Sequence, residues 1–302
     1  MINEFLDRES VALTDGQWGH LEKTVVNTAS RALVGRRFIP VYGPLGAGVQ
    51  TVPLTEFEGA SSGAVDLSGE TEADTIRTRG TRFIPVPLIH KDFQLEWRNV
   101  AATGTGLPLD PAPAAAAASY AARSEDELIF HGDRELGLDG LLTVEGRNVL
   151  PLGDWSEVGN AFEEVAKALT ERANAGGFGP YALIVAPRHD SQMHGVHERT
   201  GVLEIRNVEE LTTAGIFRSP AVPENRAIVV SVGAQNMDLA IAQDLVVGAL
   251  GPENMNLLMR VWITDAAERE RITFAVMEAG KRALDSAGIQ IPYPHLQVFW
   301  DD

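Results

Sequence analysis

The chain has no cysteine and few basic residues, and both shortages narrow the functions it can have. Without thiols there can be no disulfide, zinc–thiolate site, iron–sulfur cluster or cysteine nucleophile. The 302 residues include 42 acidic and 25 basic ones, which gives a formal net charge of −17 at pH 7. Because so acidic a surface repels phosphate backbones, we expect no nucleic-acid partner.

Long apolar runs are missing as well. No uninterrupted apolar stretch approaches the roughly 18 residues that a membrane span requires. The first ten residues carry acidic charge and no apolar segment of the kind found in secretory signals. With 44% hydrophobic and 22% charged residues, the composition is that of a globular protein with a substantial core. We therefore expect a soluble, cytoplasmic protein without a membrane partner.

The clearest local signal is an amphipathic helix near the N-terminus. Thr14 and Gln17 have the spacing of a capping box at its start, and Gly35 marks its expected end. The apolar positions follow at spacings of three and four: Trp18, Leu21, Val25, Ala29 and Leu33. Such a stripe packs against a core in most proteins.

Residues 41–100 have the pattern of a long hairpin and its base. An exposed loop rich in glycine, threonine and acid, residues 58–80, separates two extended segments. Residues 89–97 alternate between polar and apolar, which predicts a half-buried strand with Trp97 on its apolar face. Because a two-stranded ribbon buries little of its own surface, we expect this arm to pack on a neighbour.

The rest of the chain mixes helices and strands. Two further helices are predicted at 110–131 and 155–174, and short ones around 191–197 and 208–213. Strand-like segments are 181–186, 227–232, 237–242 and 257–263. This order, without regular strand–helix alternation, predicts an α+β fold.

The residues alone do not indicate an active site. His189, His194 and His197 form the only histidine cluster, but Gly195 interrupts their helix, and we interpret the cluster as a polar loop and expect no metal site. The Gly-rich segment GPLGAG lacks the lysine of a phosphate-binding loop. The acidic residues 125–127 fit a solvated face or an inter-subunit pair better than a catalytic group.

Several phrases, in order and spacing, resemble those of family 1 encapsulins. They are SRALVGRRFIPVYGPLGAGVQTVPLTEF, HKDFQLEWRNV, SEDELIFHGDRELGLDGLLT, GPYALIVAPR, HERTGVLEI and QNMDLAIAQDLVVGALGPENMN. The resemblance runs from about residue 2 to Trp262 and is closest to the myxobacterial type, which encloses ferritin-like, iron-storing cargo. It implies an HK97-like major capsid protein fold and a shell subunit that self-assembles into an icosahedral particle and is not an enzyme.

The same resemblance implies how the chain is divided and where its functional residues lie. The implied parts are an N-terminal lumenal helix and arm (1–40), an extended hairpin and its base (41–100), a peripheral domain with a spine helix (101–153), an axial domain with returning strands (154–263) and an atypical extension (264–302). The implied contacts for a short apolar C-terminal peptide of the cargo are Phe5, Leu6, Leu21, Val25 and Ala29. The implied pore-lining residues are His194, His197, Glu198 and Arg199.

Two alternatives stay open at this point. A prophage major capsid protein would share the fold, and a flavin-binding shell protein would use Trp97, the one residue that occupies the place of a flavin-contacting Trp in some relatives. We expect no resident cofactor, with a flavin as the alternative. The tail from Asp265 resembles the end of small-conductance mechanosensitive channels; without a membrane span, we expect it to form an amphipathic helix that folds back on the shell.

Overall fold

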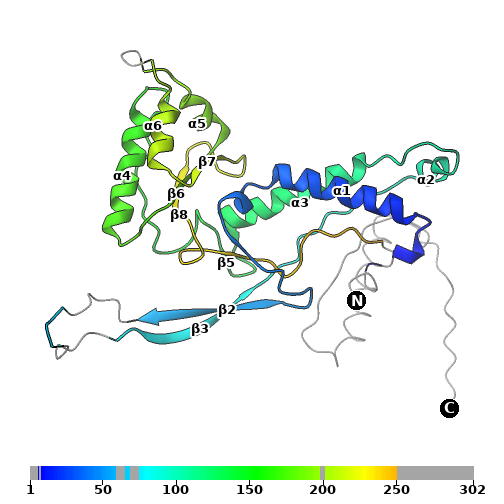
Figure 1. Ribbon diagram of the computed structural model, residues 1–302, viewed down its shortest axis with the longest axis horizontal. Coiled ribbons are helices and arrows are strands. Elements are labelled where there is room, and N and C mark those ends of the chain that lie inside the picture. Colours follow the sequence, from blue (N-terminus) through cyan, green and yellow to red (C-terminus); the bar gives the residue numbers. More distant parts are fainter. Residues whose placement is uncertain (1–5, 7, 59–64, 69–74, 198–200, 250–302) are drawn as a thin grey trace. The chain divides into compact units, whose positions relative to one another are not determined.

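The computed structural model describes residues 6, 8–58, 65–68, 75–197 and 201–249, and combines helices and strands (Figure 1). The helices are α1 (Asp15–Ala32), α2 (Trp97–Thr103), α3 (Ala112–His131), α4 (Asn160–Asn174), α5 (Pro187–Gln192) and α6 (Glu204–Leu211). The strands are β1 (Val41–Tyr42), β2 (Thr51–Glu58), β3 (Arg77–Pro85), β4 (Gly132–Asp133), β5 (Leu138–Asp139), β6 (Tyr181–Val185), β7 (Gly215–Arg218), β8 (Ala227–Ser231) and β9 (Leu239–Ala240). This is the α+β organisation that the sequence predicted.

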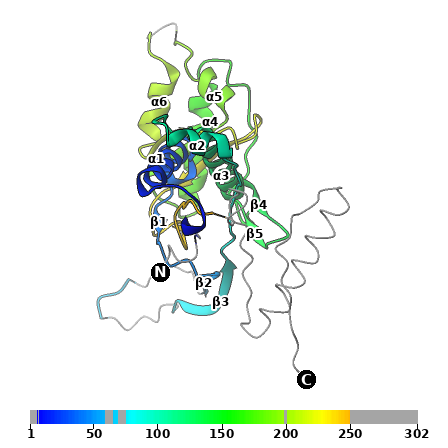
Figure 2. The ribbon, with the colours of Figure 1, turned by 90° about the vertical axis from the view of Figure 1, so that its right-hand side faces the viewer.

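Helix α1 forms as its capping box predicted. The Thr14 side chain accepts a hydrogen bond from the Gln17 backbone N–H at 3.3 Å, and the Gln17 side chain accepts one from the Thr14 N–H at 2.7 Å. The buried side chains are Trp18, Leu21, Val25 and Ala29. They pack against α3, and Figures 1 and 2 show the two helices side by side. The alanines of α3 are small enough to allow this close packing.

A three-stranded sheet with β6 at its centre lies between two apolar clusters. Strand β7 pairs with β6 in parallel and β8 pairs with it antiparallel. Leu183 and Val185 belong to the cluster that includes side chains of α4 and α6, whereas Ala182 and Ile184 belong to the one that includes Phe130 of α3. Burial on both faces explains why β6 is a continuous apolar run in the sequence.

Strands β2 and β3 form a hairpin, as expected, but its second strand is residues 77–85 and not 89–97, and it begins inside the loop expected at 58–80. Their antiparallel register runs from Thr51 opposite Pro85 to Glu58 opposite Arg77. The register skips Arg79, which therefore has no cross-strand partner. An extra residue of this kind is a β-bulge, which turns the local backbone and re-aims the side chain.

The strand expected at residues 89–97 is not formed, and this part of the prediction is wrong. Trp97 begins α2 and is 72% exposed, so it does not continue the apolar face. The alternation of burial reaches only from half-buried Phe93 to buried Leu95. The alanines and the asparagine that follow Trp97 favour a short helix over a strand.

Other element boundaries also differ from the prediction. The helix expected from Trp155 begins at Asn160, because Gly159 takes a positive φ of 111° and Trp155 turns into the core. The short helix expected at 191–197 lies earlier, as α5, and strand β7 was not expected. The predicted strand at 257–263 and the extension 264–302 lie outside the described residues.

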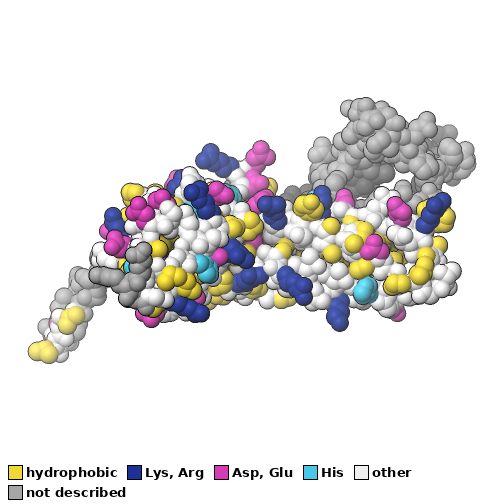
Figure 3. Space-filling model, turned by 90° about the horizontal axis from the view of Figure 1, so that it is seen from above, with side chains coloured by type: hydrophobic (Ala, Val, Ile, Leu, Met, Phe, Trp, Pro, Cys, Tyr) yellow, Lys and Arg dark blue, Asp and Glu magenta, His cyan; other side chains and the backbone are white. Residues whose placement is uncertain are grey.

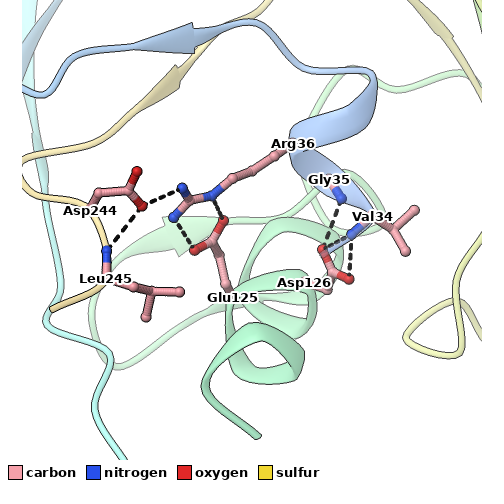
Figure 4. Close-up of polar contacts among 7 residues, drawn as sticks. All are labelled: Val34, Gly35, Arg36, Glu125, Asp126, Asp244 and Leu245. Carbon is pink, nitrogen blue, oxygen red and sulfur yellow. Dashed lines mark hydrogen bonds and ion pairs between the residues drawn. The ribbon is translucent and has the colours of Figure 1, made fainter. Parts of the chain in front are cut away.

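Glu125 and Asp126 of α3 hold the segment that follows α1 in place, so their interpretation as a solvated or inter-subunit face was wrong, whereas Glu127 is exposed. Asp126 is only 3% exposed and accepts hydrogen bonds from the Val34 N–H at 3.0 and 3.1 Å and from the Gly35 N–H at 2.8 Å (Figure 4). Burial raises the pKa of Asp126, and these two N–H groups oppose the rise. A Cβ at Gly35 would lie 2.5 Å from Ile129 Cδ1, so the close approach favours glycine.

Arg36 extends this contact in two directions. Its guanidinium meets both carboxylate oxygens of Glu125 at 2.6 and 2.7 Å, and Asp244 at 2.8 Å (Figure 4). The hydrogen bonds to Glu125 raise the pKa of Arg36 despite partial burial. Paired N–H donors on one carboxylate give both strength and a fixed orientation. We call Arg36, Glu125, Asp126 and Asp244, with the Val34 and Gly35 N–H groups, the α1–α3 clasp.

Removal of the Asp126 carboxylate should destabilise the fold. In Asp126→Ala, two buried N–H groups lose their acceptor, which should lower the free energy of unfolding by about 1–3 kcal/mol per group. Melting temperature, followed by circular dichroism, measures the loss. The matched control is Glu171→Gln, because Glu171 is an exposed carboxylate on α4 that makes no ion pair within the described residues. Equal melting temperatures for the two variants would contradict the clasp.

Candidate functional site

The residues implied as cargo contacts lie mostly inside the chain. Leu21 and Ala29 are each 1% exposed and Val25 is 5% exposed, all three packed beside α3. Leu6 is buried too, and its carbonyl oxygen accepts a hydrogen bond from the Ala249 N–H at 2.7 Å. Phe5 lies outside the described residues. The four described positions therefore offer no open surface to a peptide in this structure.

The opposite side of α1 is open. Val26 is 51% exposed, and Lys23, Asn27 and Ser30 are exposed around it. Val26 follows the buried Val25 by one residue, about 100° farther around the helix. It is therefore the large apolar side chain of α1 that a partner can contact without opening the core.

The histidine loop is a short, hydrogen-bonded turn between α5 and α6. His194 is exposed, with its Nδ1 2.8 Å from the Asp190 carbonyl oxygen, and half-buried His197 lies beside Gly159. A β-bridge between Val196 and Leu203 closes the turn. Glu198 and Arg199, the other two pore candidates, lie outside the described residues. Within the described ranges, no three histidine, aspartate or glutamate side chains are grouped so that they could hold a metal ion.

His189 differs from its neighbours in the sequence because it is buried. Its ring packs edge-on against Trp155 at 5.0 Å, and its Nδ1 has no hydrogen-bond partner among the described residues. Burial lowers the pKa of His189, and the nearby Arg188 lowers it further, while Glu224 and Glu164 act in the opposite direction. The sequence analysis predicted a polar loop for this residue. Pro187, which begins α5 directly after a buried strand, was the feature of the sequence that could have indicated a helix here.

Trp97 does not have the surroundings of a flavin site. It is 72% exposed on α2, and the Arg98 guanidinium lies 5.5 Å from its ring centre. The buried polar atoms without partners in the described part of the chain belong to His189, Gln192, Glu204 and Ser231, not to residues beside Trp97. A single exposed aromatic ring supplies a stacking platform but no enclosure, so the described residues do not fit a flavin.

The hairpin exposes apolar side chains on one face. Pro53 pairs with Phe83, and Phe57 lies four residues beyond Pro53, so all three point to the same side of the ribbon. Phe57 and Phe83 are 66% and 65% exposed. We call the uncharged arm face the surface made by Pro53, Thr55, Phe57, Thr81 and Phe83. By contrast, apolar and charged side chains are mixed on the surface in Figure 3.

Glu56 and Arg82 lie on the other face of the hairpin. Glu56 and Arg82 approach each other to 3.7 Å, and Arg82 also approaches Asp139 of β5 to 3.9 Å. An apolar surface that is left in water is unfavourable and marks an interaction site. The uncharged arm face is therefore the best candidate for a protein contact among the described residues.

Protonation of His189 should destabilise the protein. Because the folded-state pKa lies below the unfolded value, the unfolded chain binds more protons as the pH falls below about 6.5, and stability is lost there. The melting temperature should fall between pH 7.5 and pH 5.5, and the fall should be smaller in His189→Gln. The control His194→Gln, at an exposed position, should keep the wild-type dependence. The same slope in all three proteins would refute this role of His189.

Comparison with known proteins shows to which family the chain belongs. Residues 3–264 match the family described as "Encapsulating protein for peroxidase". The chain is 46% identical over 259 residues to the type 1 encapsulin shell protein EncA of Myxococcus xanthus, covering 85% of this chain and 90% of that protein. It is 38% identical over 245 residues to a diheme-cytochrome–encapsulin shell fusion protein of Kuenenia stuttgartiensis, covering 81% and 67%.

A solved structure has the same fold. The virus-like particle protein from Pyrococcus furiosus aligns with a TM-score of 0.62 at 21% identity, covering 78% of this chain and 88% of that one. This confirms the HK97-like α+β fold that the resemblance implied. In the part of the chain that is described, no helix is long and apolar enough to cross a membrane. The chain belongs to the encapsulin family and is a structural shell subunit of a nanocompartment.

Proposed function

We propose that copies of this chain close into an icosahedral particle by contacts of the arm with neighbouring copies. The observation that carries the proposal is the uncharged arm face, with two phenylalanines about two-thirds exposed. A lone chain leaves this face in water, whereas a shell covers it. Chains of net charge −17 repel one another, so an uncharged face is also where two copies can meet at least electrostatic cost.

The particle encloses a cargo enzyme with a short apolar C-terminal peptide. The cargo is of redox or ferritin-like, iron-storing type. A fused diheme cytochrome in the Kuenenia relative and the peroxidase in the family description support a redox cargo. The chain itself is not an enzyme and needs no cofactor. Its compartment is the bacterial cytoplasm, without a membrane partner.

Nucleic acid is not the content of this particle. A prophage capsid of the same fold must hold the phosphate charge of DNA, which a chain of net charge −17 repels. The match to encapsulin shell proteins over most of the chain also favours a protein cargo.

The arm contact is tested by two substitutions on opposite faces. Phe57→Ser removes an exposed apolar group from the uncharged arm face, and at about 25 cal/mol per Å² its loss should weaken each contact by roughly 1–3 kcal/mol. The control Leu54→Ser lies on the other face and is 42% exposed. Sedimentation and negative-stain imaging should show fewer or aberrant particles for Phe57→Ser only. Intact shells from Phe57→Ser would argue against this contact.

Cargo loading distinguishes the two sides of α1. Leu21→Asp should abolish folded particles, because it places a charge in the core beside α3. Val26→Asp should leave particles intact and reduce co-purification of a tagged cargo about tenfold or more, if the peptide docks on α1 from the open side. Folded particles of Leu21→Asp that contain no cargo would instead show that the peptide binds the stripe formed by Leu21, Val25 and Ala29.

Pore selectivity is assigned to His194, His197, Glu198 and Arg199, repeated around a symmetry axis. Protonated imidazole groups are cationic, so a ring of histidines favours small anions in acid. Uptake of an anionic dye by intact shells should rise several-fold from pH 7.5 to 5.5. It should not rise in the double variant His194→Ala, His197→Ala. Equal uptake by both proteins at both pH values would place the pore elsewhere.

A further inference from the structure

One arginine of the arm has no acidic partner among the residues that the structure describes. Three of the nine residues of β3 are arginines. Arg82 meets Glu56 and Asp139, and Arg77 lies opposite Glu58, but Arg79 is the residue that the register skips. It is exposed and makes no ion pair within the described residues. The β-bulge therefore presents Arg79 without a cross-strand partner, whereas Arg77 lies opposite Glu58, although these two make no ion pair within the described residues.

An acidic groove lies at the C-terminal end of α3. It has a volume of about 540 Å³. Its lining residues include Ser124, Glu127, Leu128, Asp133, Pro220 and Pro223. The His131 Nε2 lies 2.7 Å from the Ala221 carbonyl oxygen, which ties the end of α3 to the turn that carries the two prolines. Both walls of the groove are thus held by the fold.

The lining suits an arginine side chain. The leucine and proline side chains offer apolar surface to the methylene groups of the arginine, while the carboxylates of Glu127 and Asp133 offer oxygens to the guanidinium. Glu127 is only weakly engaged in its own chain, by an exposed pair with Arg123 at 3.6 Å. This pair can be exchanged for a new one at little cost.

We propose that the groove of one copy binds Arg79 of a second copy, so that the arm is anchored at the end of α3 of its neighbour. The inference rests on the proposed shell function and specifies where the arm docks. Charge complementarity favours a second copy as the occupant: the groove is acidic, and Arg79 is an unpaired cation on the element that leaves an uncharged face open. The uncharged arm face supplies buried area, and Arg79 fixes the register.

Site-directed crosslinking tests the contact directly, because the chain has no cysteine and gives no background. Thr78→Cys with Ser124→Cys places one thiol beside Arg79 and one in the groove without altering either charge. A short bismaleimide should then convert assembled chains into covalent dimers and larger multimers on denaturing gels. The control pair, Thr78→Cys with Ser30→Cys on α1, should stay monomeric.

Charge reversal supplies a second test. Arg79→Glu and Glu127→Arg should each raise the concentration needed for assembly about fivefold, and the double variant should restore it. Lys167→Glu, an exposed reversal on α4, should have no effect. If the wild type forms no particles, both the shell function and the contact are refuted. If the wild type forms particles but the Thr78→Cys, Ser124→Cys variant gives no intermolecular crosslinks, crosslinks inside single chains only, or a groove crosslinked to cargo, the contact alone is refuted.

Discussion

A buried carboxylate determines how the two long helices of this protein continue into the rest of the chain. Asp126 accepts the N–H groups of Val34 and Gly35, at the point where α1 has ended and the chain turns toward β1. Arg36, the next residue, reaches Glu125 on the same helix and Asp244 on the returning segment. Three stretches that are far apart in the sequence are thereby fixed to one another.

The position of the arm depends on this clasp. Beyond Arg36 the chain enters β1, which pairs in parallel with β9, and then the hairpin begins. Farther along α3, at its C-terminal end, His131 fixes the turn that forms one wall of the acidic groove. The same helix therefore orients the arm of its own chain and, in our proposal, receives the arm of the next. Closed symmetric shells require both directions to be set within one subunit.

Sequence reasoning succeeded where local chemistry decides the structure. The capping box at Thr14 and the spacing of the α1 stripe predicted that helix, and the loop rich in glycine and acid predicted the hairpin. The continuous apolar run of β6 identified a buried strand. The fold family followed from longer phrases of the chain, which the matched relatives bear out.

Sequence reasoning failed where contacts between segments far apart in the chain determine the structure. Asp126 resembles its exposed neighbour Glu127 in the sequence, and only the return of Val34 and Gly35 to α3 makes it a buried acceptor. The stripe of Leu21 and Val25 was correctly placed on one face, but that face is covered by the chain's own alanines, a contact that one helix cannot reveal. The polar–apolar alternation was expected to continue to Trp97, but α2 begins at that residue and the alternation of burial ends before it.

The central claim is that this chain builds closed shells through its arm. Single-particle imaging of the purified wild-type protein at neutral pH and low micromolar concentration tests it most directly. We predict hollow particles of icosahedral symmetry in which each hairpin lies on a neighbouring copy and the uncharged arm face is covered. Monomers or small open oligomers, or shells in which that face points into solvent, would contradict this account.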